Sequence, residues 1–120
     1  MPTFSQGNVV RVPFPYTRDV QPRRPALVIS GGALGDGLLM WVLMITSAGN
    51  RPWPGDVDLS GELETTGLPA PSVVRTAKIA TIETSIALPL GRVSEQTMER
   101  VRSAMFDWVG ELTSAERRNG

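Results

Sequence analysis

Residues 26–46 read ALVISGGALGDGLLMWVLMIT and decide the fold, because they hold two apolar runs separated by a turn. The first run, residues 26–29, is short and lies between Pro25 and a pair of glycines, which is typical of a buried strand. The second run, residues 38–46, is far shorter than the roughly 20 residues of a bilayer-spanning helix. It therefore predicts a second buried strand. The two runs together predict a β-hairpin at the centre of a sheet.

Further strands are predicted on both sides of this hairpin. Residues 9–14 alternate with the period of two that marks a half-buried strand, and the three prolines within residues 15–25 indicate a loop. Residues 57–59, 72–82 and 86–90 predict further strands, separated by loops at 48–55 and 61–71.

The hydrophobic period changes to that of a helix after residue 94. Ser94 is suited to an N-cap, and Glu95 follows in the first turn, where the helix dipole favours a carboxylate. Apolar residues then recur at helical spacing, namely Met98, Val101, Met105, Val109 and Leu112. We predict one amphipathic helix over residues 95–112, and a frayed polar tail over 113–120. The chain is thus expected to be one mainly β (α+β) domain over residues 1–112.

Composition narrows the chemistry that a chain of 120 residues can perform. Cysteine and histidine are both absent, which excludes disulfides, thiolate zinc sites, cysteine nucleophiles and any Ser-His-Asp triad. The 12 basic and 12 acidic residues balance, so the chain as a whole carries no nucleic-acid signature. Locally, however, residues 1–30 contain Arg11, Arg18, Arg23 and Arg24 against Asp19 alone. Arginine binds phosphate through two parallel hydrogen bonds, which lysine cannot do.

Four segments occur in an order that is typical of one family. They are GNVVRVPFPYT at residues 7–17, RRPALVIS at 23–30, VLMITS at 42–47 and GLPAPSVVR at 67–75. In this order and spacing the chain resembles, over residues 7–112, the MazF/PemK family of toxin endoribonucleases from type II toxin–antitoxin pairs. The resemblance implies an SH3-like small β-barrel (MazF/PemK/CcdB-like) with a C-terminal amphipathic helix. It also implies a homodimer that binds a cognate antitoxin protein and single-stranded RNA. Because the longest apolar run is too short to span a bilayer, we expect no membrane segment and a cytoplasmic protein.

The same resemblance places the catalytic residues at Arg24 and Thr46. RNA contacts are expected from the loop before Arg24, from the strand end and from the long strand, namely at Tyr16, Thr17, Arg18, Gln21, Arg23, Ser47 and Lys78. No cofactor and no metal are expected. Two departures from the family pattern stand out. Asn8 replaces the usual Asp, and the loop over residues 16–23 lacks the usual Glu.

The residue chemistry agrees with metal-independent cleavage of RNA. The 2′-hydroxyl of RNA can attack the adjacent phosphate, which gives a 2′,3′-cyclic phosphate and a 5′-hydroxyl end. A guanidinium and a hydroxyl then stabilise charge on the phosphorane oxygens. Arginine is a poor base, so the proton acceptor stays open between Asp19 and another carboxylate.

Each of these residues also has a purely structural interpretation. Arg24 could be a solvated loop charge, Arg75 and Lys78 solvent-face charges, and Tyr16 and Trp53 either loop anchors or stacking partners of bases. The acidic residues of the 56–64 region are expected to form a solvated edge, namely Asp56, Asp58, Glu62 and Glu64. Trp41, Trp53, Phe106 and Trp108 exceed what one small barrel easily hides, which favours a homodimer.

Two other functions remain open alongside ribonuclease activity. The chain could be a CcdB-like toxin that poisons a protein target, or a catalytically dead barrel that only binds RNA. Neither alternative needs both Arg24 and Thr46.

Overall fold

The computed structural model describes residues 3–13, 23–32 and 34–119, with the backbone alone for residues 111–119. It contains six strands, which are β1 (Asn8–Val12), β2 (Arg24–Val28), β3 (Leu39–Ser47), β4 (Asp56–Asp58), β5 (Ser72–Glu83) and β6 (Leu88–Arg92). Two α-helices, α1 (Leu63–Thr66) and α2 (Glu95–Asn119), accompany them. Short 3-10 turns lie at η1 (Leu34–Gly37), η2 (Ser60–Glu62) and η3 (Thr84–Ile86).

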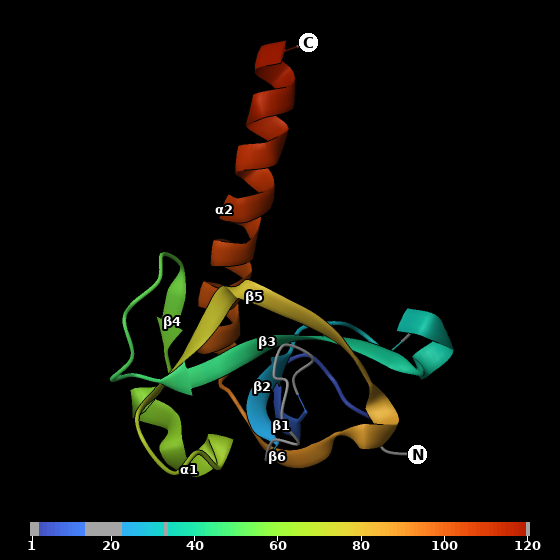
Figure 1. Ribbon diagram of the computed structural model, residues 1–120, viewed down its shortest axis with the longest axis vertical. Helices are drawn as coiled ribbons and strands as arrows, with labels where there is room; N and C mark the ends of the chain where they lie inside the picture. Colours follow the sequence, from blue (N-terminus) through green and yellow to red (C-terminus); the bar gives the residue numbers. More distant parts are fainter. Residues whose placement is uncertain (1–2, 14–22, 33, 120) are drawn as a thin grey trace.

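The strands form one antiparallel sheet in the order β4-β5-β3-β2-β1-β6 (Figure 1). The predicted hairpin is confirmed, since β2 and β3 pair at the centre with Ala26 opposite Met44. The mainly β class with a C-terminal helix is confirmed as well. Among the described residues the sheet does not close into a barrel, because β4 and β6 remain edges. The register shift between Leu43 and Met44 disrupts the ladder locally, and β5 bends sharply (Figure 1).

The two faces of the sheet bury separate apolar clusters. One cluster comprises Phe4, Val10, Val12, Ala26, Val28, Met40, Val42, Ala80, Ile82 and Ala87. The other lies on the face that meets α2 and comprises Val9, Leu27, Leu43, Ile45, Val57, Leu59, Leu68, Val74, Val93, Met98 and Val101. Because β1, β2 and β3 are buried on both faces, they form a rigid frame for any group at their ends.

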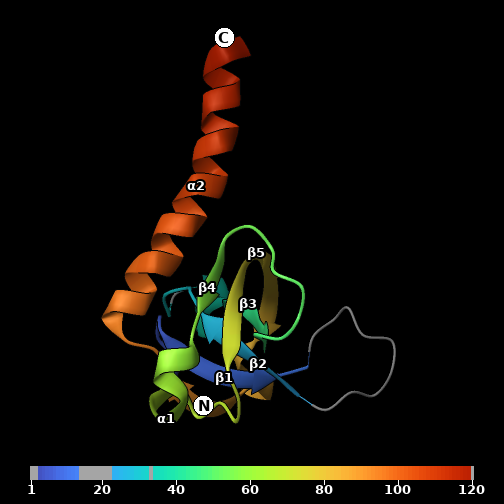
Figure 2. The same cartoon turned by 90° about the vertical axis from the view of Figure 1, so that its left-hand side faces the viewer.

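Helix α2 begins at Glu95 as predicted but continues to Asn119, beyond the predicted end at residue 112. The added segment contains the good helix formers Ala115, Glu116 and Arg117, whose propensity outweighs the polarity that indicated a frayed tail. Its C-terminal part projects away from the sheet (Figures 1 and 2). Val109, expected in the core, is therefore 59% exposed. The boundary between a domain over residues 1–112 and a separate tail stays a prediction.

Helix α1 was not predicted, because residues 61–71 were expected to form a loop. Its four residues include two threonines, which have low helix propensity. Tertiary contacts supply what propensity lacks. The fully buried Thr66 hydroxyl donates to the Glu62 carbonyl at 2.6 Å, and Gly67, with φ of +72°, ends the helix in the left-handed conformation. Across the described residues, no helix combines the length and apolar character needed to cross a bilayer.

Candidate functional site

The strand register brings Arg24 and Thr46 together. Strands β2 and β3 pair Ala26 with Met44, and continuing this antiparallel register sets Arg24 opposite Thr46. Side chains directly opposite each other in such a ladder share a face. Two residues that are far apart in the sequence thus lie side by side at the end of the central hairpin.

Both residues line a cleft of about 430 Å³ over the ends of these strands. Three arginines contribute to its wall, namely Arg11, Arg23 and Arg24, and none of the described residues that line it is acidic. The other lining residues are Pro25, Ile45, Thr46, Ser47, Asn50, Leu68, Pro69, Ala70, Pro71, Ser72 and Leu90. A concave surface of one charge sign concentrates ligands of the opposite sign, so this cleft is suited to an anion.

The hydroxyl of Thr46 is oriented by Asn50. The Asn50 side-chain amide donates a hydrogen bond of 2.7 Å to Thr46 Oγ1. A hydroxyl has one proton and two lone pairs, so accepting this bond leaves the proton of Thr46 to be donated elsewhere. A tight turn holds Asn50 in place, since its backbone N–H donates to the Ser47 carbonyl at 3.1 Å.

The two adjacent arginines have different partners. Arg23 is exposed and donates through Nη1 to the backbone carbonyl of Ile86. The guanidinium of Arg24 is exposed, and among the described residues it has no hydrogen bond or ion pair. Among the described residues, nothing therefore competes with a ligand for the forked donors of Arg24.

Two residues of the cleft, Arg11 and Asn50, were not predicted as site residues from the sequence. Arg11 lies on β1 opposite Pro25 of β2 and lines the wall of the cleft. Asn50 follows a glycine in a polar turn, but only the folded turn returns its amide to Thr46. Of the predicted RNA contacts, Arg23 and Ser47 line the cleft. Tyr16, Thr17, Arg18 and Gln21, and the candidate base Asp19, lie outside the described residues.

Lys78 and Arg75 lie beside the indole of Trp53 rather than in the cleft. Lys78 is half-buried, with Nζ 5.9 Å from the Trp53 ring centroid. The expectation that Arg75 is a solvent-face charge is wrong, because its residue is 9% exposed and its guanidinium carbon lies 4.2 Å from the same centroid. Arg75 lies where β5 shifts register between the partners of Leu43 and Met44, so the regular alternation of a strand does not hold there.

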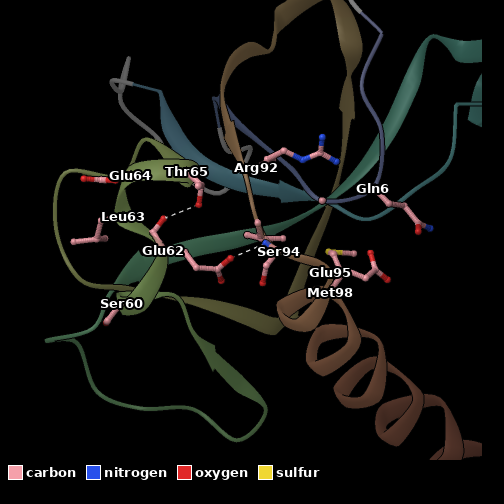
Figure 3. Close-up of a pocket in the computed structure, with 13 residues that line it drawn as sticks. Gln6, Ser60, Glu62, Leu63, Glu64, Thr65, Arg92, Ser94, Glu95 and Met98 are labelled. Carbon is pink, nitrogen blue, oxygen red and sulfur yellow. Dashed lines mark hydrogen bonds between the residues drawn. The ribbon is translucent and has the colours of Figure 1, made fainter.

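A larger cavity of about 730 Å³ lies between α1, β6 and the start of α2 (Figure 3). Glu62 lies on its wall and accepts hydrogen bonds from the Ser94 backbone N–H at 2.6 Å and from the Thr97 hydroxyl. Burial acts to raise the pKa of Glu62, but these hydrogen bonds lower it more, so the pKa falls below its ordinary 4.5. Glu62 thus caps α2 from outside the helix.

The expected solvated edge of acidic residues holds for Asp58 and Glu64, which are exposed, but not for Asp56 and Glu62. The side chain of Asp56 is 12% exposed and faces Arg75, and Glu62 is half-buried at the helix cap. Asp58 accepts a 2.7 Å hydrogen bond from the Ser60 hydroxyl, which lowers the pKa of Asp58. Although these acidic residues are close together in the sequence, Asp56, Glu62 and Asp58 each contact a different partner. Within the described part of the chain, no group of three or more acidic side chains is arranged to hold a metal ion.

Comparisons with known proteins agree with this fold. The MazE-MazF structure (form II) from Deinococcus radiodurans is 25% identical, with a TM-score of 0.72, and the match covers 92% of this chain and 98% of that chain. The MazF structure (form I) from the same organism gives 25% identity, a TM-score of 0.72 and coverage of 92% and 99%. An endoribonuclease in complex with its cognate antitoxin, from a mycobacterial species, is 20% identical over 92% and 96% at a TM-score of 0.69, which supports the fold alone.

A comparison with curated proteins found no match. The family model for PemK-like, MazF-like toxins matches residues 5–108, which is most of the chain and includes the cleft and its flanking strands. The chain therefore belongs to the PemK-like, MazF-like toxins of type II toxin–antitoxin systems.

Proposed function

We propose that this toxin is a sequence-selective endoribonuclease that cuts single-stranded RNA, such as mRNA, in the cytoplasm without a metal ion. The observation that supports this most is the cleft in which three arginines stand beside the oriented hydroxyl of Thr46. An RNA phosphate matches this set, because arginine and hydroxyl groups donate to phosphate oxygens. Cleavage of messages would stop translation and growth.

In the proposed reaction, the 2′-oxygen of one nucleotide attacks the adjacent phosphorus and the bond from phosphorus to the 5′-oxygen breaks. The leaving oxygen gains a proton, and the products carry a 2′,3′-cyclic phosphate and a 5′-hydroxyl. Arg24 stabilises the charge on the non-bridging oxygens, and Thr46 donates its free proton to one of them. The 2′-hydroxyl proton needs an acceptor, and Asp19 is the carboxylate nearest in sequence to Arg23 and Arg24.

RNA is positioned by groups around this pair. Arg23 and Ser47 line the cleft, and Lys78 lies beyond it next to Trp53. Tyr16, Thr17, Arg18 and Gln21 belong to the connection between β1 and β2, which enters β2 at Arg24. We assign these residues to substrate binding and, in the case of the connection, to sequence preference.

The proposed protein partners are an antitoxin and a second copy of the chain. Family membership and the similarity to a MazE-MazF structure support the antitoxin. A largely apolar hollow of about 280 Å³ supports the homodimer, since Trp41, Ile79 and Phe106 line it and are 44%, 42% and 74% exposed. Exposed apolar patches of this kind mark protein interfaces.

Substitution of the two cleft residues tests the proposal. We expect Arg24→Ala and Thr46→Ala each to lower the rate of RNA cleavage by about 100- to 1,000-fold while the fold is retained, because each removes a donor to the phosphorane. Arg92→Ala is the matched control, since Arg92 is an exposed arginine on the wall of the other cavity. Turnover near that of the unsubstituted protein in either cleft variant would overturn the site. Growth arrest without any RNA cleavage would favour the CcdB-like alternative.

A further inference from the structure

The loop between β3 and β4 carries an indole that is both exposed and tightly held. Trp53 is 39% exposed and lies between Pro52 and Pro54, which restrict the backbone on both sides. The backbone N–H of Trp53 donates to Asp56 Oδ2 at 2.9 Å, and the backbone carbonyl of Trp53 accepts from the Asp56 N–H at 3.2 Å. The backbone that carries the ring is therefore fixed by Asp56.

A buried guanidinium supports this ring from one side. The Arg75 side chain stacks on the indole and donates through Nη2 to the Arg51 carbonyl at 2.5 Å. Arg75 Nε and Asp56 Oδ1 are 3.8 Å apart, and both are buried without a hydrogen bond among the described residues. A buried pair with such long geometry contributes little to stability. Its effect is to hold a cation against the Trp53 ring, and Trp53 keeps 39% of its surface exposed.

The supported indole is next to the candidate cleft. Asn50, which lines the cleft and orients Thr46, is part of the same loop as Trp53. On the sheet, Thr46 pairs with Val73 and Met44 pairs with Arg75. Arg75 is therefore two residues, or about 7 Å, along β5 from Val73. The loop that carries the indole therefore borders the cleft, within reach of a strand whose phosphate is bound there.

We propose that Trp53 is a stacking platform for one nucleobase that flanks the scissile phosphate, with Arg75 as its support. This proposal rests on the proposed ribonuclease function. Bases of single-stranded RNA are splayed out and stack on aromatic side chains, and an exposed indole beside a cationic cleft provides such a surface. The ammonium of Lys78, 5.9 Å from the Trp53 ring centroid, adds positive charge next to the indole. Loss of one such stacking contact weakens binding by roughly 10- to 100-fold.

The test combines side-chain and base deletions in the full-length protein. The cleavage sites are first mapped on mixed RNA, and oligonucleotides around one site are then made with a single abasic nucleotide at each flanking position in turn. A 2′-deoxy substitution at the cut nucleotide blocks cleavage, so that Kd can be measured. Trp53→Phe retains an aromatic face, and Trp53→Leu replaces it with an apolar side chain closer in size to phenylalanine than to tryptophan.

We expect one abasic position to raise the Kd of the unsubstituted protein by roughly 10- to 100-fold and to have no further effect on Trp53→Leu. On the cleavable oligonucleotide, Trp53→Leu raises KM by a similar factor and keeps kcat within about threefold, and Trp53→Phe stays close to the unsubstituted protein.

Two outcomes distinguish failure of the stacking platform from failure of the proposed ribonuclease function. If the unsubstituted protein cleaves RNA but every abasic position affects it and Trp53→Leu equally, the platform is wrong and the ribonuclease stands. If the unsubstituted protein neither cleaves nor binds RNA, the proposed function fails, and the platform fails with it.

Discussion

At the scale of single residues, the direction of one hydrogen bond determines what Thr46 can do. With the Asn50 amide donating to Oγ1, the hydroxyl proton of Thr46 is available to a phosphate oxygen. An acceptor in place of that amide would take the proton itself. Asn50 is therefore a positioning residue that acts through Thr46.

Two substitutions of Asn50 distinguish positioning from simple packing. We expect Asn50→Asp to lower kcat by about 100-fold, because the carboxylate accepts from Thr46 and repels the RNA phosphate. Asn50→Ala frees the hydroxyl to rotate and is expected to lower kcat by only about tenfold. Single-turnover kinetics with both variants provides the measurement. An Asn50→Asp protein as active as Asn50→Ala would show that the direction of this hydrogen bond does not matter.

At the scale of elements, the cap that Glu62 places on α2 couples two parts of the chain. Ser94 is the N-cap, since its hydroxyl accepts from the Thr97 N–H at 3.2 Å, as the sequence predicted. The carboxylate that satisfies the Ser94 N–H comes from the segment before α1 instead of from the helix itself. This long-range cap fixes where α2 leaves the sheet.

Removal of this carboxylate should destabilise the protein in a pH-dependent way. We expect Glu62→Gln to lower the free energy of unfolding at pH 7 by about 1 kcal/mol. The folded state lowers the pKa of Glu62, so its stabilisation is complete above the ordinary value of 4.5 and is lost as pH falls through the lower folded pKa.

Denaturant unfolding at pH 7 and at pH 3 measures this difference. Glu64→Gln is the control, because Glu64 is exposed on the adjacent helix α1 and lies on the wall of the same cavity. A difference between Glu62→Gln and the unsubstituted protein that is as large at pH 3 as at pH 7 would contradict the cap.

The elements that the sequence predicted well are those with long, unambiguous patterns. The central hairpin follows from two apolar runs around a glycine-rich turn, and the start of α2 follows from Ser94 and the change of period. Helix α1 could not be predicted, because tertiary contacts such as the buried Thr66 hydroxyl stabilise it against low propensity. The burial of Arg75 was missed because the register shift in β5 depends on its partner strand.

The residues of the candidate site also differ in how far they could be predicted from the sequence. Arg24 and Thr46 could be singled out from the family resemblance, and the register then brings them together. Asn50, Arg11 and the support under Trp53 could not be found, because each depends on contacts between segments that are distant in sequence or folded back by a turn.

At the scale of the whole molecule, α2 extends beyond the sheet (Figure 2). Exposed apolar side chains line the hollow between α2 and the sheet. Phe106 is 74% exposed at the edge of the hollow that also includes Trp41. We expect a homodimer at micromolar concentration, and we expect Phe106→Glu to raise the dimer Kd by at least about tenfold, because a charge would be buried without a partner. Sedimentation velocity is the measurement.

Leu88→Glu is the control for this substitution, since Leu88 is 50% exposed on the edge strand β6, outside the hollow. A monomeric unsubstituted protein at micromolar concentration would refute the dimer.

The most direct test of the ribonuclease function is incubation of the purified toxin with mixed single-stranded RNA in excess EDTA, followed by analysis of the new ends. We predict cleavage at a restricted set of sequences, with 2′,3′-cyclic phosphate and 5′-hydroxyl ends, as attack by the 2′-hydroxyl requires. The chain has no histidine, so the pH profile should lack a histidine titration near about 6.5. Intact RNA, or cleavage that requires magnesium and leaves 5′-phosphate ends, would contradict the proposed mechanism.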